Sequence, residues 1–331
     1  MVTIKDIARM AGVSQSTVSK ALNNRHDIGQ ETKEKILKIV EQHNFSPNAF
    51  GKSLKSKKTG NIGVIFSREQ NPLSSNPFYS RVLEGIEAEL AINNYNLMLN
   101  MIQENAKDAI PKVVRERQID GLILIGVFRD SFVDRILAEN LCVVLVDPKN
   151  YCDKCSQILI DNEHGAFSAT QHLVDAGHRK IGFVSGDLER ASFLQRFDGY
   201  KKALNFNNIP IDNGLIRTGG IEEGYNHVKN ILLENKATAI FVANDINALH
   251  GYKAIYDLNL KVPDDISIVG FDDIWLSKIS SPPLTTIRVY KEELGSIAVR
   301  ALLKNIQNRV ATFVNTIVPT KLIERDSVKR I

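Results

Sequence analysis

Short, almost continuously apolar segments recur along the chain from residue 61 and alternate with longer segments of helical periodicity. We expect strands at NIGVIF, YNLMLN, DGLILIG and CVVLVD, and later at KIGFVSG, TAIFVAN and ISIVGFD. Helices are expected over residues 78–93, 163–176, 192–206 and 245–258. Continuously apolar strands separated by helices form parallel sheets that are covered on both faces. The sequence therefore predicts an α/β body with two parallel sheets, one in each half.

Length and composition place this body in a multidomain, water-soluble chain. A chain of 331 residues is too long for one compact core. Its 43% apolar and 24% charged residues are typical of globular proteins. No apolar run approaches the roughly 20 residues of a membrane span, and MVTIKDIARM does not resemble a signal peptide. We expect a cytoplasmic protein that does not bind membranes.

Charge is distributed unevenly along the chain. Residues 1–60 hold 11 Lys or Arg and five Asp or Glu, a net charge of +6. The remaining residues hold 31 basic and 33 acidic side chains, a net charge of −2. A small basic head on a nearly neutral body indicates that a polyanion binds at the head.

The first 45 residues have the spacing of three short helices. Thr3 can cap the first helix with Asp6 as its capping-box partner, and Gly12 can end that helix at positive φ. Ser14 can cap the second helix, and QETKEKILKIVEQHN supplies a third with an apolar stripe. This pattern predicts a helix-turn-helix DNA-binding domain. A solvated helical hairpin without function is the alternative that the local pattern leaves open.

The stretch TIKDIARMAGVSQSTVSKALNN resembles the helix-turn-helix of the lac/gal repressor family of bacterial transcription regulators. The resemblance continues through FSPNAFGKSLKSKKTGNIGVIF and then along the whole chain. It implies that the second helix enters the major groove of DNA. The positions that match base-reading sites are Gln15, Ser16 and Lys20, and those placed to contact phosphates are Thr3, Ser14, Thr17, Ser19 and Asn23. Many members carry Arg where Lys20 stands, so we expect a weaker preference for guanine.

A basic segment, SPNAFGKSLKSKKTG, follows at residues 46–60. The resemblance implies a hinge helix that docks in the DNA minor groove, with Leu54 as a wedge at the central base step and Lys55 among the DNA-contacting positions. The family usually has Ala and Arg where this chain has Gly51 and Lys52. Gly disfavours a helix by roughly 0.5–1 kcal/mol relative to Ala, so we expect a weaker hinge helix and weaker operator binding. From the residues alone, a flexible basic linker is the alternative.

The resemblance also implies a bilobed body of the type I periplasmic-binding-protein fold. Residues 1–45 would form the helix-turn-helix domain, 46–60 the hinge helix and linker, and 61–331 the effector-binding and dimerisation domain. The N-lobe is expected over 61–160 plus about 290–318, and the C-lobe over about 161–289 plus 319–331. The effector would bind in the cleft between the lobes, outside the carboxyl ends of the strands.

Candidate effector-binding residues lie at the expected strand ends. By family position Arg196 and Asp272 are the strongest candidates, because a planar guanidinium and a carboxylate can together hold adjacent hydroxyls of a sugar. The full set is Phe78, Tyr79, Asp161, Arg190, Ser192, Arg196, Asn244, Phe271, Asp272 and Trp275. The alternative is structural, with Asp272 capping its own loop and Arg196 pairing with a surface carboxylate.

Departures from the family pattern limit what can be said of the ligand. The loop TGGIEEGY places Ile221 where some members carry an aromatic residue, and it is one residue short. Trp275 stands where many members have Pro, and it either supplies the missing stacking face or is plain hydrophobic cover. The segment SREQNPLSSNPF is longer than usual, and we expect it to reshape the mouth of the cleft.

Enzymatic motifs are missing from the sequence. It contains no G-x-S-x-G, no P-loop and no H-E-x-x-H, and its seven histidines have no metal-ligand spacing. We expect no catalysis, metal or cofactor. Cys152 and Cys155 form one CxxC, which is half of a tetrahedral zinc site. A plain loop is expected there, with adventitious metal binding or a redox bridge as alternatives.

Together these features predict a homodimeric repressor that binds near-palindromic operator DNA, one head per half-site. The expected effector is a small sugar or sugar phosphate that releases the repressor from genes of carbohydrate use. Corepression, and control by a partner protein as in the catabolite-control members, are the alternatives. Two readings from other classes are a transport binding protein and a sugar-modifying enzyme that uses Asp161 and Asp272. The head and the N-terminal sequence argue against the first.

Overall fold

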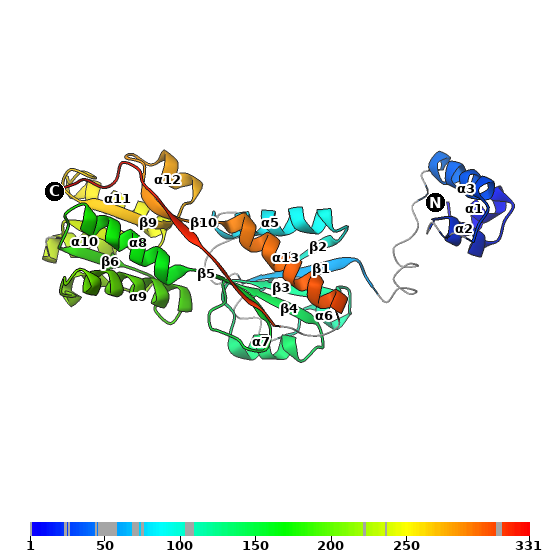
Figure 1. The fold of residues 1–331 in the computed structure, drawn as a ribbon, viewed down its shortest axis with the longest axis horizontal. Coiled ribbons are helices and arrows are strands. Elements are labelled where there is room, and N and C mark those ends of the chain that lie inside the picture. The colour runs from blue at the N-terminus through cyan, green and yellow to red at the C-terminus, as the bar shows by residue number, and fades with distance from the viewer. Residues whose placement is uncertain are drawn as a thin grey trace. The chain divides into compact units, whose positions relative to one another are not determined.

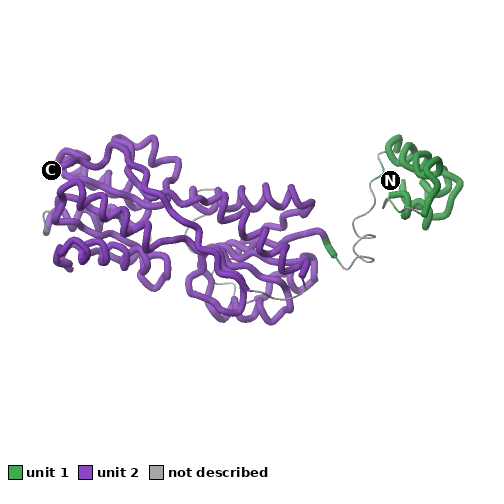
Figure 2. The backbone as a smooth tube through the Cα atoms, viewed as in Figure 1, with its two compact units in different colours: residues 1–59 green, residues 60–331 purple. Residues whose placement is uncertain are grey.

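The computed structural model divides into two compact units, residues 1–59 and 60–331 (Figure 2). It describes residues 2–22, 25, 27–43, 45, 58–67, 73, 76–102, 109–220, 223–235, 237–308 and 313–331. Asn23, Leu54 and Lys55 lie outside these residues, as do Gly51, Lys52, Ile221 and most of the expected extended loop. The predictions made for them therefore stay predictions. Among the described helices, none is both long and apolar enough to cross a membrane.

The first unit contains the three predicted helices, α1 (Ile4–Ala11), α2 (Gln15–Leu22) and α3 (Gln30–Gln42). The Thr3 hydroxyl accepts from the amide of Asp6 at 3.4 Å, and the amide of Thr3 donates to the Asp6 carboxylate at 3.1 Å. Gly12 ends α1 with a φ of 71°, which a residue without Cβ adopts readily. The miniature core consists of Ile7, Ala8, Ala11, Val18, Ala21 and Ile36. Local capping and an apolar stripe thus account for the head.

The second unit contains two six-stranded sheets, as the α/β pattern predicted. The first has the order β11-β5-β4-β3-β1-β2, and its described pairings are all parallel. Its strands are β1 (Asn61–Ser67), β2 (Asn96–Ile102), β3 (Gly121–Ile125), β4 (Cys142–Val146), β5 (Ser156–Ile160) and β11 (Asn315–Val318).

The second sheet has the order β12-β10-β9-β8-β6-β7. It is parallel except where β12 runs antiparallel to β10 at one edge. Its strands are β6 (Ile181–Val184), β7 (Ile216–Arg217), β8 (Ala239–Val242), β9 (Ser267–Asp272), β10 (Thr285–Val289) and β12 (Thr320–Ile323).

Helices cover both faces of each sheet (Figure 1). In the first, α5 and α13 pack together on one side, and apolar residues of α6 and α7 cover the other. In the second, α8 and α9 pack as a pair, and α10 and α11 pack as another. Their bounds are α5 (Tyr79–Ile92), α6 (Lys112–Arg115), α7 (Asp130–Leu137), α8 (Asn162–Asp175), α9 (Ala191–Phe206), α10 (Gly224–Asn235), α11 (Asp245–Asp257), the short α12 (Trp275–Ile279) and α13 (Lys291–Asn308), with a 3₁₀ turn η2 (Asn213–Leu215).

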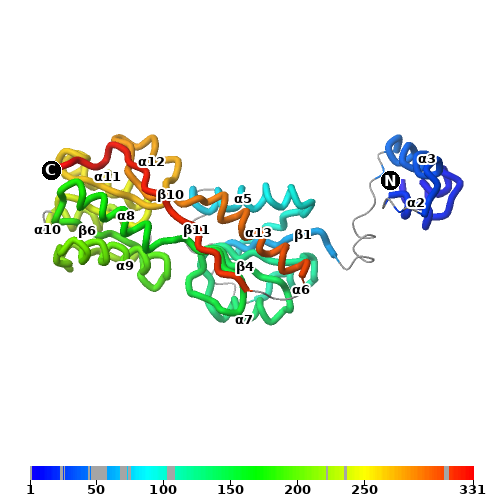
Figure 3. Tube along the Cα trace, viewed as in Figure 1, coloured from blue at the N-terminus to red at the C-terminus, as the bar shows by residue number. Residues whose placement is uncertain are grey.

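The chain passes between the two sheets three times (Figure 3). The crossings join β5 to α8, β10 to α13, and β11 to β12. Each is short: Asp161, Tyr290 and Pro319 are the single residues between the paired elements. Such short connections tie the position of one sheet to the other through the residues next to them.

The contact of α5 with α13 depends on glycine. A Cβ at Gly85 would lie 1.9 Å from the carbonyl oxygen of Glu292, and a Cβ at Gly295 would lie 2.2 Å from the carbonyl oxygen of Val82. Both obstacles are backbone atoms, which cannot move aside as a flexible side chain can. The two helices therefore approach as closely as they do because neither carries a side chain at these points.

We expect Gly85→Ala to lower the stability of the body by about 1–3 kcal/mol, the usual range for overpacking. Thermal unfolding of the full-length protein, followed by circular dichroism, measures the change. The matched control is Glu87→Ala on the exposed face of the same helix, which should shift the melting temperature far less. Equal shifts in the two variants would show that the close approach of α5 and α13 is unimportant.

Candidate functional site

A cavity of about 540 Å³ lies between the two sheets. It is lined by residues that follow the carboxyl ends of β3, β4, β6, β8 and β9, together with the first turn of α5. This is where open α/β sheets bind ligands. Seven of the ten candidates line it, namely Phe78, Tyr79, Arg190, Ser192, Arg196, Asn244 and Asp272.

Arg196 and Asp272 meet at one wall of the cavity. The Arg196 guanidinium lies 3.3 Å from Asp272 Oδ1 and is stacked 3.7 Å from the centre of the Phe271 ring. It also donates to Asn162 Oδ1 at 2.9 Å and to the carbonyl of Ala243 at 2.5 Å. Burial raises the pKa of Asp272 to about 6, against the opposing effect of the Arg196 charge. Asp272 Oδ1 is buried against the Arg196 guanidinium, so a ligand donor would meet the part of the Asp272 side chain that lines the cavity.

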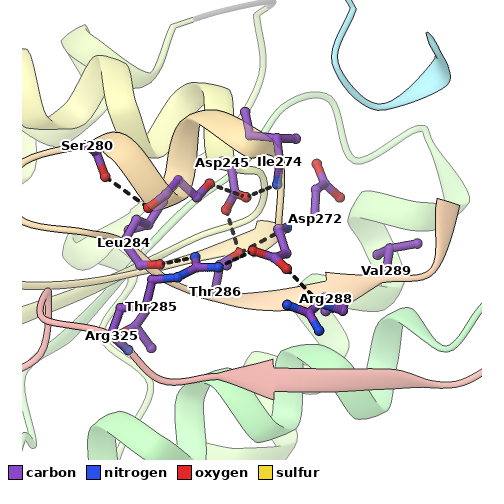
Figure 4. Close-up of polar contacts among 12 residues, drawn as sticks. Asp245, Asp272, Ile274, Ser280, Leu284, Thr285, Thr286, Arg288, Val289 and Arg325 are labelled. Carbon is purple, nitrogen blue, oxygen red and sulfur yellow. Dashed lines mark hydrogen bonds and ion pairs between the residues drawn. The ribbon is translucent and has the colours of Figure 1, made fainter. Parts of the chain in front are cut away.

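A tight corner of the backbone aims Asp272 into the cavity. Asp272 and Asp273 have φ values of 113° and 48°, a region that residues with a Cβ rarely adopt. The Asp273 carboxylate holds the corner by accepting from Arg288 at 2.7 Å and from Arg325 at 2.5 Å. Figure 4 labels both arginines beside the corner of Asp272. Burial acts to raise the pKa of Asp273, but the bonds from Arg325 and Arg288 outweigh it and lower that pKa. Asp273 therefore remains charged. It holds β10 through Arg288 and the segment after β12 through Arg325.

Lys291 supports the same corner from the other lobe. It begins α13, and its ammonium donates to the carbonyls of Asp272, Asp273 and Val289 at 2.5, 3.2 and 3.1 Å. Burial lowers the pKa of Lys291, while nearby carboxylates, first of all that of Asp272, oppose this effect. The corner that presents Asp272 is thus tied directly to a helix that packs on the first sheet.

Asp245 lies behind Asp272 and is fully buried. Its carboxylate accepts from the amide of Ile274 at 2.9 Å and from the hydroxyl of Thr286 at 2.6 Å (Figure 4). It also accepts from the hydroxyl of Ser277 at 2.7 Å. Burial, and next the Asp272 charge, raises the pKa of Asp245 to about 7. Asp245 therefore holds the segment after the corner and does not line the cavity.

The opposite wall of the cavity is aromatic and belongs to the first sheet. Asn76 caps α5 by accepting from the amides of Phe78 and Tyr79 at 3.1 and 2.9 Å. The Tyr79 hydroxyl donates to Asp147 at 2.8 Å, and the Phe78 and Tyr79 rings meet edge to face. Burial, and next the Asp147 charge, raises the pKa of Tyr79 well above its ordinary value. The tyrosine therefore stays a neutral donor that orients Asp147.

Three expected effector residues do not line the cavity. Phe271 is fully buried and supports Arg196 from behind. Asp161 caps α8 by accepting from the amide of His164 at 3.3 Å. Trp275 begins α12 and is 61% exposed to solvent. Successive residues of a strand point to opposite sides, which is why Phe271 is buried while its neighbour Asp272 faces the cavity.

The structure also supplies cavity residues that the sequence interpretation missed. They are Asn76, Phe128, Arg129, Asp147, Lys149 and Phe193 among others. Asp147 and Lys149 directly follow β4, so the rule about carboxyl ends of strands could have found them. Phe193 stands next to Ser192, one of the expected residues.

The DNA-contact candidates of the head lie on and around α2. Gln15, Ser16 and Lys20 are exposed, whereas Val18 and Ala21 on the opposite side are buried. Ser14 accepts from the amide of Thr17 at 3.1 Å. Of the remaining candidates that the structure describes, Thr3 and Ser14 are exposed, and Thr17 and Ser19 are half-buried. Lys20 pairs with Asp27 at 2.7 Å, a contact that DNA would have to replace.

Comparison with known proteins agrees with both parts of the structure. Residues 3–48 match the family described as bacterial regulatory proteins, lacI family, and residues 170–328 match a periplasmic binding protein-like domain. An HTH-type transcriptional repressor PurR from Mannheimia succiniciproducens is 32% identical over 339 residues, with all of both chains covered. The chain belongs to the lacI family of bacterial regulatory proteins.

Two further similarities support this assignment. The ribose operon repressor of Haemophilus influenzae is 34% identical over 333 residues, with 99% of each chain covered. A crystal structure of the lac repressor dimer bound to operator and the anti-inducer ONPF superposes with a TM-score of 0.86 at 29% identity, again with 99% of each chain covered. The protein is therefore a DNA-binding transcriptional repressor with an effector-binding domain, and it is not an enzyme.

The buried carboxyl of Asp245 should make the stability of the body depend on pH. Its pKa rises from 3.8 to about 7 on folding, so the folded chain binds the proton more tightly than the unfolded chain. The resulting stabilisation is complete below the unfolded pKa and is lost as pH rises towards about 7. Asp245→Asn removes this titration. We expect the melting temperature of wild type, relative to that of this variant, to fall as pH rises from about 5 to about 8.

Thermal unfolding in a series of buffers measures this difference. The exposed Asp264→Asn serves as the control and should keep a constant offset from wild type. A constant offset for Asp245→Asn as well would mean that Asp245 is already ionised at the lower pH.

Proposed function

We propose that this repressor binds a small sugar or sugar phosphate in the cavity and that the bound effector releases it from operators of carbohydrate-utilisation genes. The observation that carries the proposal is the pair formed by the Asp272 carboxylate and the Arg196 guanidinium, 3.3 Å apart, which both line the cavity. A hydroxyl of a sugar donates to such a carboxylate and accepts from such a guanidinium.

The rest of the cavity supports the same ligand class. Its volume of about 540 Å³ is in the ordinary range for small-molecule sites. Phe78, Tyr79 and Phe193 provide aromatic surface for the apolar faces of a ring, while Asp147 and Asn244 add polar groups at the strand ends. The ribose operon repressor, one of the relatives, carries a sugar in its name. The remaining lining candidates, Arg190 and Ser192, would contact the ligand from the start of α9.

Effector binding would reach the DNA through the lobes. Asp272 belongs to the second sheet, but Lys291 and the two arginines on Asp273 connect its corner to elements at the crossings. A ligand that binds one lobe arrangement better shifts the population towards it, and only by its difference in affinity. In this mechanism Asp273 and Lys291 are positioning residues, whereas Asp272 and Arg196 contact the effector.

On the DNA side we propose a cytoplasmic homodimer that reads a near-palindromic operator, with Gln15, Ser16 and Lys20 at base edges. The dimeric lac repressor structure supports the assembly. Large exposed apolar side chains on α11 and α12 support a contact surface there, since such side chains often mark interfaces. These are Tyr256, Trp275 and Ile279. The roles of Asn23, Leu54 and Lys55, and the hinge helix itself, remain part of this proposal.

Asp272→Asn should abolish or strongly weaken effector binding, because it keeps the shape of the side chain but removes the charge that pairs with Arg196. We expect the sugar-induced rise in melting temperature to disappear while operator affinity without sugar is retained. A thermal-shift screen with mono- and disaccharides and their phosphates identifies the ligand in wild type, and the variant is then tested with it. Arg196→Ala should also lose the response.

The exposed Asp264→Asn is again the control and should respond as wild type does. A normal response of Asp272→Asn would contradict the assignment of the cavity. No response of wild type to any member of the panel would contradict the sugar class and favour control by a partner protein or by another ligand.

Lys20→Ala should weaken binding to an operator selected from randomised duplexes by about 1–3 kcal/mol, the range for one base-reading contact. Fluorescence anisotropy at constant salt measures the affinity for this operator and for an unrelated duplex. Lys38→Ala, an exposed lysine of α3, is the matched control for loss of one positive charge. If both variants lose the same affinity for both duplexes, Lys20 contacts phosphate and does not read a base.

A further inference from the structure

The loop between β4 and β5 carries a pair of thiols that the repressor function does not use. Cys152 and Cys155 are both free, and their sulfurs lie 3.7 Å apart. Among the described residues, no group of three or more His, Cys, Asp or Glu side chains is placed to hold a metal ion. The structure therefore gives this pair no completed zinc site and leaves the chemistry of a dithiol.

The two thiols differ in access to solvent. Cys155 is 1% exposed and packs in the apolar cluster beneath the loop, whereas Cys152 is half-buried. Burial, and next the proximity of Cys152, raises the pKa of Cys155. A small oxidant therefore reaches Cys152 first, and Cys155 is placed to attack the sulfur of Cys152 afterwards.

The start of this loop contacts the effector cavity and the opposite lobe. Asp147 and Lys149 line the cavity. The carbonyl of Lys149 accepts from the amide of Ala191 at 3.0 Å, and its ammonium pairs with Glu189 at 3.3 Å. Ala191 begins α9, the helix that carries Arg196. Movement of the loop would therefore reach the wall of the effector site.

The end of the loop is held to the third crossing. The backbone of Cys152 makes two hydrogen bonds with the Gln157 side chain, from its amide to Gln157 Oε1 at 3.0 Å and to its carbonyl from Gln157 Nε2 at 2.5 Å. Gln157 Nε2 also donates to Asn315 on β11 at 3.0 Å. Pro319 alone separates β11 from β12 of the other sheet. Cys152 is thus linked through the Gln157 side chain to β11, the strand that precedes the third crossing.

We propose that Cys152 and Cys155 form a reversible disulfide in exchange with low-molecular-weight disulfides such as glutathione disulfide, and that this bridge weakens effector binding. The effect on effector binding rests on the proposed function, whereas the formation of the bridge does not. Bond formation must bring the sulfurs from 3.7 Å to about 2.05 Å. In this proposal the loop tightens around Cys152 as the bridge forms, and this movement displaces the Cys152 contacts with Gln157 and the Lys149 contact with α9.

The exchange is balanced in two steps. The Cys152 thiolate attacks glutathione disulfide, forms a mixed disulfide and releases one glutathione thiolate. The Cys155 thiolate then attacks the Cys152 sulfur, forms the protein disulfide and releases the second glutathione thiolate. The two thiol protons pass through solvent to the two glutathione molecules, so the protein dithiol is oxidised and one glutathione disulfide is reduced to two thiols.

The first test titrates the native full-length protein with glutathione disulfide in the presence of a chelator and counts free thiols after quenching. Wild type should lose two of its three thiols, and peptide mass spectrometry should join Cys152 to Cys155. Cys142→Ser should form the same bridge. Cys155→Ser should accumulate one glutathione on Cys152, because the resolving thiol is missing. A wild type that keeps three free thiols, or that retains glutathione without forming the bridge, overturns the proposal.

The second test compares reduced and oxidised wild type in effector titrations followed by thermal shift. We expect effector affinity to fall by at least about fivefold on oxidation, which is the low end of ordinary coupling between sites. The double variant Cys152→Ser/Cys155→Ser should be unaffected by glutathione disulfide. A bridge that forms without changing effector affinity overturns the link to the cavity.

If reduced wild type shows no thermal shift with any sugar, the proposed function fails, but the proposal that the disulfide forms does not. In that case hydrogen exchange of the Ala191 amide in the two redox forms decides the structural link. Faster exchange in the oxidised form supports it, and unchanged exchange overturns it.

Discussion

The arrangement of the two lobes depends on the hydrogen bonds that the buried ammonium of Lys291 donates. It stands at the start of α13, which packs on the first sheet. Its three hydrogen bonds go to the carbonyls of Asp272 and Val289, which end β9 and β10 of the second sheet, and of Asp273 just after β9. A buried charge without partners carries a penalty of several kcal/mol, so the ammonium cannot leave these carbonyls freely. The corner at Asp272 and the start of α13 must therefore move together.

Asp273 extends this constraint to two more elements. Arg288 lies on β10 next to the second crossing, and Arg325 follows β12 beyond the third. Both arginines pair with the single Asp273 carboxylate, one at each oxygen, and so hold a corner at which Asp272 and Asp273 both have positive φ. A strained backbone conformation of this kind persists because the surrounding ion pairs and hydrogen bonds hold it in place. The Asp272 side chain, which faces the cavity, is consequently held by a backbone corner that contacts elements of both lobes.

The sequence predicted what depends on local pattern and on family position. The head follows from capping residues and apolar spacing, and the two sheets follow from apolar runs between helices. Family position indicated Arg196 and Asp272, and the structure brings them to one wall of the cavity. Five strands of the structure, β5, β7, β10, β11 and β12, were not predicted. The edge strands β7 and β11 are not continuously apolar, so their assignment depends on neighbours far away in the sequence.

What the sequence could not predict depends on contacts between distant segments. In the sequence, Lys291 cannot be distinguished from a lysine on the exposed face of a helix. It is a buried donor only because the Asp272–Asp273 corner lies against it. The place of Asp147 follows from the end of β4, but the direction of its carboxylate depends on the hydrogen bond from Tyr79, 68 residues earlier. Trp275 shows the reverse case: it begins α12 three residues past Asp272, and the side chain expected as a stacking face is exposed to solvent. Strand ends indicate where a site lies, but the direction of each side chain is decided by the corner that follows the strand.

In the proposed function, effector selection and signal transmission both depend on Asp272. Its carboxylate lines the cavity and lies 3.3 Å from the Arg196 guanidinium. A ligand that donates a hydrogen bond to this carboxylate would gain free energy that an analogue without the donor does not. Asp272 also belongs to the corner that Lys291 and Asp273 hold beside the crossings. On this proposal, the contact that selects the effector is also the contact through which binding energy favours one lobe arrangement over another.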